Sequence, residues 1–125
     1  MSRKRTFTGE IPLELIARRL RAMADPSRLA VLHGLCDGEK CVTELMEATR
    51  LSQTNLSKHL RILKGENLVV ARRNHRHVYY RLSSEAPEEI CELVCESIRE
   101  RTAIDRARID RYLARRHPRK AAARS

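Results

Sequence analysis

The chain has 125 residues, 42% hydrophobic and 34% charged, which is enough apolar material for one ordinary core and excludes a chain that is disordered throughout. Lysine and arginine number 26 against 16 aspartate and glutamate, and the net charge of +10 favours a polyanionic partner, either nucleic acid or an anionic membrane surface. No uncharged stretch approaches the roughly 18 apolar residues of a spanning helix, and no apolar run follows the basic N-terminus. We therefore expect a cytoplasmic protein without a membrane span, whose four cysteines are thiols, metal ligands or redox sensors.

The positive charge falls in two regions separated by an acidic one. Residues 50–81 hold eight basic residues and one acidic residue, residues 82–98 hold five acidic ones, and residues 99–125 hold ten basic and three acidic ones. We expect a basic N-terminal arm over residues 1–10 and a folded domain over 11–100. Over residues 101–125 we expect a basic helical extension that ends in a disordered tail.

Two helices are predicted before residue 36. Pro12 suits the first position of a helix, because the N–H that proline lacks has no partner there. Behind it, apolar side chains recur every three or four residues, at Leu13, Ile16, Leu20 and Met23. Asp25 followed by Pro26 is a second start signal, and a leucine stripe follows it at Leu29, Leu32 and Leu35.

A helix-turn-helix pattern comes next. A short helix is expected over residues 42–48, and Ser52 is the expected N-cap of the following helix. That second helix runs to about Gly65, with one apolar face formed by Leu56, Leu60 and Leu63.

After Gly65 the apolar period changes from 3.6 residues to two. Residues 68–72 and 78–82 are rich in β-branched and aromatic side chains and flank a polar tip, which predicts a two-stranded hairpin. Asn74 is expected to supply any positive φ at this tip. An acidic segment then opens a last helix, which we expect to exceed 25 residues because its apolar stripe continues through Ile90, Val94, Ile98, Ile104, Ile109 and Leu113.

These elements predict a mainly α fold with a small β-hairpin, a winged helix-turn-helix of about five helices and a two-stranded wing. One long amphipathic helix on so small a domain needs a partner surface to cover its apolar stripe. We therefore expect a homodimer, whose interface is formed by the first and last helices through Leu13, Ile16, Leu20, Ile90, Val94 and Ile98.

Three segments, MADPSRLAVL (residues 23–32), LSQTNLSKHLRIL (51–63) and VYYRL (78–82), occur in the order found in the ArsR/SmtB family of bacterial repressors. The chain resembles that family over residues 11–100. The resemblance implies a homodimer that binds double-stranded operator DNA and releases it on sensing an inducer, often a metal or metalloid ion.

The second helix of the helix-turn-helix carries polar side chains in its first two turns, away from its leucine face. Glutamine and asparagine there can pair bidentately with adenine in the major groove, so we assign base reading to this helix start. Arginines straddle the hairpin tip, where they can contact phosphate or the minor groove. The alternative is that both sets are merely solvated surface. The candidate DNA-binding residues are Gln53, Thr54, Asn55, Ser57, Lys58, Arg72, Arg73 and Arg76.

Cys91 and Cys95 stand four residues apart on the last helix, so they share a face and can hold one soft ion between two thiolates. Cys36 and Cys41 flank the turn before the helix-turn-helix. The family's sensing segment typically carries Cys-x-Cys, whereas here Thr43 follows Cys41 in the second place. Three interpretations stay open. The first is a site for a thiophilic ion such as As(III) as inducer, formed by Cys91 and Cys95 with or without Cys41 or Cys36; the second is a thiol switch in which Cys36 or Cys41 pairs with Cys91 or Cys95. The third is packing by small apolar side chains.

The sequence thus favours a sequence-specific repressor that is released from its operator by an effector. The alternative is a constitutive or organic-ligand-responsive DNA-binding protein in which the cysteines are only structural. An enzyme is not expected, because the chain has no glycine-rich phosphate loop and no nucleophile in a recognisable motif.

Overall fold

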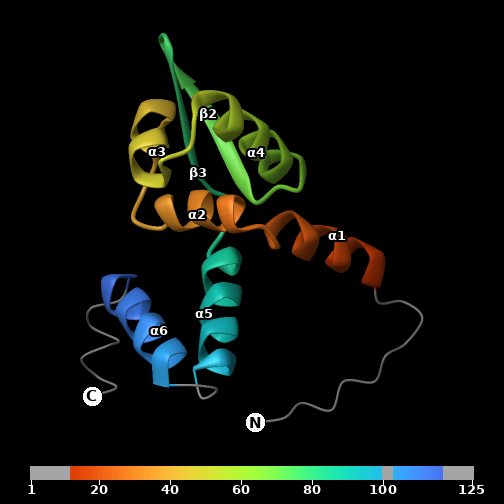
Figure 1. Ribbon diagram of the computed structural model, residues 1–125. Coiled ribbons are helices and arrows are strands. Elements are labelled where there is room, and N and C mark those ends of the chain that lie inside the picture. Colours follow the sequence, from red (N-terminus) through yellow and green to blue (C-terminus); the bar gives the residue numbers. More distant parts are fainter. Residues whose placement is uncertain (1–11, 100–102, 117–125) are drawn as a thin grey trace.

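The computed structural model describes residues 12–99 and 103–116 (Figure 1). The predicted basic arm over residues 1–10 and the predicted tail beyond residue 116 lie outside the described residues. Within them the chain forms six helices and three strands: α1 (Leu13–Met23), α2 (Pro26–Gly34), β1 (Lys40–Cys41), α3 (Val42–Thr49), α4 (Gln53–Gly65), β2 (Val69–Asn74), β3 (His77–Leu82), α5 (Ala86–Ile98) and α6 (Ala103–Arg116). The winged helix-turn-helix is confirmed, with α3 and α4 as its two helices and β2–β3 as the wing.

The capping signals read from the sequence place the starts of α2 and α4, whereas Pro12 is the N-cap of α1 and not its first residue. The Asp25 carboxylate accepts a hydrogen bond from the backbone N–H of Arg28 at 2.9 Å, with Pro26 as the first residue of α2. The Ser52 hydroxyl accepts from the backbone N–H of Asn55 at 3.2 Å and so caps α4. The Arg28 side chain donates back to the Ala22 carbonyl at 2.6 Å, which ties the end of α1 to α2.

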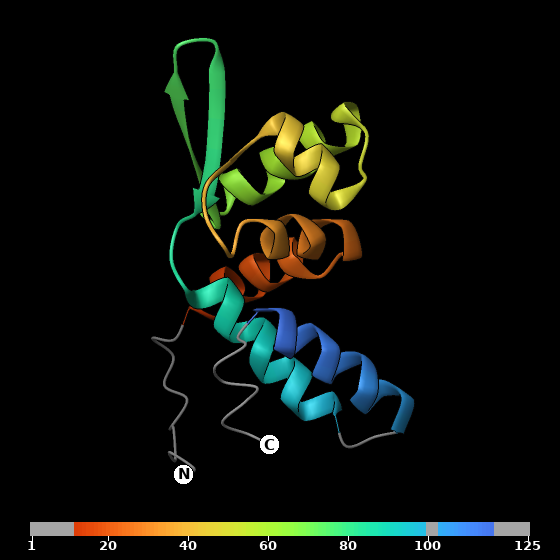
Figure 2. The ribbon, with the colours of Figure 1, turned by 90° about the vertical axis from the view of Figure 1, so that its left-hand side faces the viewer.

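The core lies between α2, α3, α4 and the base of the wing. Its most deeply buried apolar side chains are Val31, Leu32, Leu45, Leu56, Leu63 and Val69. The leucine face predicted for α4 therefore points inward, and its polar face points outward. In Figures 1 and 2, α2 crosses the middle of the molecule, with α3, α4 and the wing on one side of it and α5 and α6 on the other.

The sheet has a third strand that the sequence pattern did not reveal. β1 is only two residues long and pairs antiparallel with β3, so the strand order is β1-β3-β2. Two residues are too few to show an alternating period, which is why only the hairpin could be predicted. At the hairpin tip the positive φ of 58° belongs to His75, whereas Asn74 was expected to supply it. Asn74 instead pairs with His77 as the last residue of β2.

The prediction of one long last helix, made from the apolar stripe, is wrong. α5 ends at Ile98, and α6 folds back and packs against α5 (Figures 1 and 2). An ion pair between Arg99 Nε and Asp110 Oδ1, at 3.0 Å, links the two helices, and Leu113 of α6 is buried. Part of the predicted apolar stripe is therefore buried within a single chain. The end of α5 at Ile98 divides the predicted last helix into two, which gives six helices instead of about five.

Two apolar faces stay open to solvent. Leu13, Ile16 and Leu20 of α1 are exposed, as are Val94 and Ile98 of α5. Ile90 differs from the other predicted interface residues because it is half-buried and packs against the core. No helix in the described ranges is both long and apolar enough to cross a membrane.

Candidate nucleic-acid interface

The start of α4 presents a polar surface. Because Leu56, Leu60 and Leu63 anchor one side of the helix in the core, its other side faces solvent. Four of the predicted DNA-binding residues come together there and, with Arg61, line a surface hollow; they are Gln53, Thr54, Ser57 and Lys58. Asn55 is exposed as well but does not line the hollow.

Arg61 is a member of this surface that the sequence analysis missed. It follows Ser57 and Lys58 by four and three residues, and residues at those spacings are neighbours on a helix. The helical period could therefore have identified it. Its guanidinium extends the polar surface from the first two turns of α4 into the third.

The tip of the wing extends beyond α3 and α4, whereas β2 contacts α4 and β3 contacts α3 (Figures 1 and 2). Arg73 lies near its end, paired with Val78 across the hairpin, and Arg76 lies in the tip itself. Both side chains are exposed. Within the described ranges neither arginine, nor Lys58 or Arg61 on α4, has an acidic partner. Four cations are thus available to neutralise phosphates on the side of the molecule that holds α4 and the wing.

Arg72 is placed differently from the other wing arginines. Its guanidinium donates to both carboxylate oxygens of Glu39, from Nε at 2.7 Å and from Nη2 at 2.6 Å. It also lies over the Tyr79 ring, 5.0 Å from the centroid. These hydrogen bonds lower the pKa of Glu39 below its usual value and raise that of Arg72. Arg72 thus has a partner inside the chain before any DNA arrives.

The four cysteines lie at three places. Cys91 and Cys95 share one face of α5, as predicted from their spacing, and both line an apolar cavity of about 660 Å³. Helices α1, α2 and α6 complete that cavity, among others through Leu20, Leu29 and Tyr112. All four cysteines carry thiols rather than disulfides. Within the described residues, no group of three or more histidine, cysteine, aspartate or glutamate side chains is placed to hold a metal ion.

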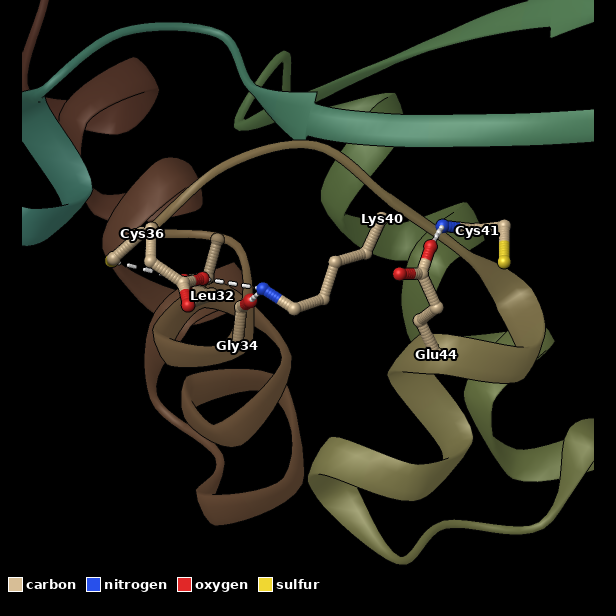
Figure 3. Close-up of polar contacts among 7 residues, drawn as sticks. Leu32, Gly34, Cys36, Lys40, Cys41 and Glu44 are labelled. Atoms are coloured by element: carbon tan, nitrogen blue, oxygen red, sulfur yellow. Dashed lines mark hydrogen bonds and ion pairs between the residues drawn. The ribbon is translucent and has the colours of Figure 1, made fainter.

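Cys36 and Cys41 lie on either side of Lys40, at the end of α2 and the start of α3 (Figure 3). The Cys36 thiol donates to the Leu32 carbonyl at 3.1 Å. Cys41 is the N-cap of α3, and its backbone N–H donates to Glu44 Oε1 at 3.0 Å, which lowers the pKa of that carboxyl. Lys40 donates to the Gly34 carbonyl and to Asp37, and the bond to Asp37 lowers the pKa of the aspartate.

Both the sequence and the fold match known proteins. A family model described as bacterial regulatory protein, arsR family, matches residues 25–70. The HTH-type transcriptional repressor SmtB of Mycobacterium tuberculosis is 38% identical over 81 residues, which cover 62% of this chain and 60% of that protein. The chain thus spans about 60% of the length of this curated relative.

Two solved structures are covered more fully. NolR from Sinorhizobium fredii superposes with a TM-score of 0.65 at 36% identity, over 74% of this chain and 94% of the other. A homodimeric winged helix-turn-helix DNA-binding domain from Mycobacterium bovis, described as a possible ArsR-family transcriptional regulator, superposes with a TM-score of 0.63 at 32% identity. That match covers 76% of this chain and 93% of the other.

Proposed function

Because the chain belongs to the ArsR family of bacterial regulatory proteins, we propose that it is a transcriptional repressor that binds double-stranded operator DNA as a homodimer. The family is one of regulators, not of enzymes. The observation that carries the proposal is the exposed polar start of α4 beside a basic wing. We place the DNA-binding unit within residues 11–100 and regard α6 as a helical extension of it.

The two parts of this surface have different roles in the proposal. Gln53, Asn55 and Ser57 read base edges, since amide and hydroxyl groups at a helix start match the hydrogen-bonding pattern of the major groove. Thr54, Lys58 and Arg61 fix the register of α4 on the backbone. Arg73 and Arg76 of the wing contact phosphate, which carries no sequence information.

Alanine substitutions in α4 test this division of roles. A duplex is selected from a random pool by the wild-type protein, and its affinity is compared with that of a scrambled duplex by fluorescence anisotropy at fixed salt. Gln53→Ala and Asn55→Ala should each cost about 1–3 kcal/mol on the selected duplex and little on the scrambled one. Arg76→Ala is the control and should weaken both duplexes alike. If the ratio of the two affinities is unchanged in both α4 variants, the base-reading assignment is wrong.

The proposed effector site is the dithiol on α5. Two thiolates four residues apart on a helix suit a soft, thiophilic ion such as As(III), and Cys91 and Cys95 open into the same cavity beside the exposed faces of α1 and α5. A ligand there can change how two protomers pack and so the separation of their α4 helices. Release requires tighter binding of the ligand to the DNA-free form, and a coupling of about 1–3 kcal/mol lowers operator affinity roughly 5- to 150-fold.

A double substitution tests the effector site. Cys91→Ser with Cys95→Ser should keep DNA binding but lose release by As(III), and native mass spectrometry of the reduced dimer should show no bound ion. Cys36→Ser is the matched control, because that thiol lines a different pocket beside the charged side chains of Asp37 and Lys40, and the variant should be released like the wild type. A double variant that still responds to As(III) would refute the assignment. A wild-type protein that is released by oxidants but not by As(III) would favour the thiol switch.

The cavity also favours a second candidate, an organic effector. Its lining is almost wholly apolar, and a volume of about 660 Å³ is typical of small-molecule sites. In that case Cys91 and Cys95 are packing residues, and the double serine variant keeps the full response. The amphiphilic dye anilinonaphthalene sulfonate, whose aromatic rings bind apolar sites, is a suitable probe, because its binding should be competitive with such an effector. A protein that holds its operator under every one of these conditions is constitutive.

A further inference from the structure

We propose that Glu39, Arg72 and Tyr79 form a clamp that fixes the angle of the wing, so that Arg72 is a positioning residue for DNA binding and not a phosphate contact. Only the DNA-binding part of its test, described below, rests on the proposed function. Its starting point is the register of the sheet. Arg72 of β2 lies opposite Tyr79 of β3, and Tyr79 lies opposite Cys41 of β1. Directly paired residues project from the same face of a sheet, so these three side chains form one row across it.

Glu39 lies at the β1 end of this row and contacts Arg72. It immediately precedes β1, and its two carboxylate oxygens meet Arg72 Nε and Nη2 in a fork at 2.7 and 2.6 Å. The clamp therefore starts at one edge strand, passes over the aromatic ring on the central strand and ends at the other edge strand. Bidentate pairing and stacking on an aromatic ring both depend on the planar guanidinium, which lysine lacks.

The backbone alone restrains the wing weakly. β1 is joined to β3 by two residue pairs only, Lys40 with Tyr80 and Cys41 with Tyr79. Val69 is the one fully buried residue of β2, Val70 and Ala71 are half-buried, and residues 72–77 are exposed. A side-chain link from β2 to the segment that begins α3 therefore adds a constraint between the wing and the helix-turn-helix. A fixed wing angle sets where Arg73 and Arg76 lie relative to α4, which lowers the entropy lost on binding.

The same contacts argue against a phosphate role for Arg72. The Glu39 carboxylate already neutralises the guanidinium and would repel a neighbouring phosphate. Arg73, the next residue in the strand, projects from the opposite face of the hairpin. Arg73 therefore differs from Arg72 in both direction and partner, and it serves as the matched comparison within one strand.

The DNA arm of the test measures affinity for the selected duplex against salt concentration. Glu39→Gln and Arg72→Gln should each weaken binding about two- to fivefold, and the double variant should be no weaker than the weaker single one. Arg72→Lys keeps the charge but not the fork, and it should be as weak as Arg72→Gln. None of these variants should change the slope of log K against log salt, whereas Arg73→Gln should reduce its magnitude by about 0.9.

Glu39→Gln is the decisive variant, because simple electrostatics predicts the opposite change in DNA affinity. Removing a negative charge near DNA should tighten binding unless the carboxylate holds Arg72 in place. If Glu39→Gln binds as well as the wild type or better, the clamp is refuted. If Arg72→Gln reduces the salt slope as Arg73→Gln does, Arg72 contacts phosphate and the clamp is refuted as well.

A second arm needs no DNA. The ¹⁵N heteronuclear NOE of the backbone amides of residues 73–77 should fall in Glu39→Gln and in Arg72→Gln relative to the wild type, while α2 and α4 are unchanged. Equal values in variants and wild type would overturn the clamp. If the wild type selects no duplex, the proposed function fails, and this arm still decides the clamp.

Discussion

Val94 offers the sharpest test of the homodimer. It lies on the open face of α5 and is 50% exposed in the single chain. Full burial of a valine side chain is worth about 1.5–3 kcal/mol, so covering the exposed half contributes about 1 kcal/mol. In a symmetric dimer the residue occurs on both sides, which doubles the contribution to about 2 kcal/mol.

An aspartate at this position loses that contribution and also adds two charges. Each carboxylate loses hydration or faces another carboxylate, at a cost of about 1–3 kcal/mol. Val94→Asp should therefore weaken the dimer by about 4–8 kcal/mol, or roughly 10³- to 10⁶-fold in Kd. Operator binding should fall with it, since two half-sites require two α4 helices at a fixed separation.

Sedimentation velocity over nanomolar to micromolar concentrations measures the effect. Ile104→Asp on α6 is the control, because Ile104 is 73% exposed and lies outside the predicted interface. It should leave the dimer intact. A Val94→Asp protein whose Kd stays within tenfold of the wild type, or a wild-type protein that is monomeric at micromolar concentration, would refute the assignment of this face.

Three further predictions concern the core, acid stability and the wing. Leu56→Ala should lower the free energy of unfolding by about 2–5 kcal/mol in urea titrations, because this fully buried side chain anchors α4 and its loss leaves a cavity. Hydrogen bonds to Lys40, Arg72 and Cys41 lower the pKa values of Asp37, Glu39 and Glu44, respectively. The stability that these carboxylates confer should therefore be complete above the ordinary carboxyl pKa of about 4, and it should be lost as the pH falls through the lowered values. Circular dichroism during acid titration measures this loss. Arg76→Gln should weaken all DNA sequences alike and reduce the magnitude of the salt slope by about 0.9, and a sequence-dependent loss would contradict its assignment to phosphate.

Short-range sequence signals were enough to predict the helix-turn-helix, the wing and the outward face of α4. The N-caps at Asp25 and Ser52, the leucine period of α4 and the alternation along the wing each depend on residues within one or two turns of one another. Such short-range patterns specify a helix-turn-helix with a hairpin behind it, and they place the polar side of α4 outward. The resemblance to the ArsR/SmtB family came from the same segments.

The tertiary structure decided what depends on residues distant in sequence. The fold-back of α6 could not be seen in an apolar stripe that continues across the break, because periodicity records faces and not the direction of the chain. The pairing of β1 needs Tyr79 and Tyr80, some 40 positions away, and two residues have no period of their own. The partner of Arg72 is likewise set by that pairing: only when β1 lies beside β3 does Glu39 come within hydrogen-bonding distance, and a cation that looks free in the sequence becomes one half of a clamp.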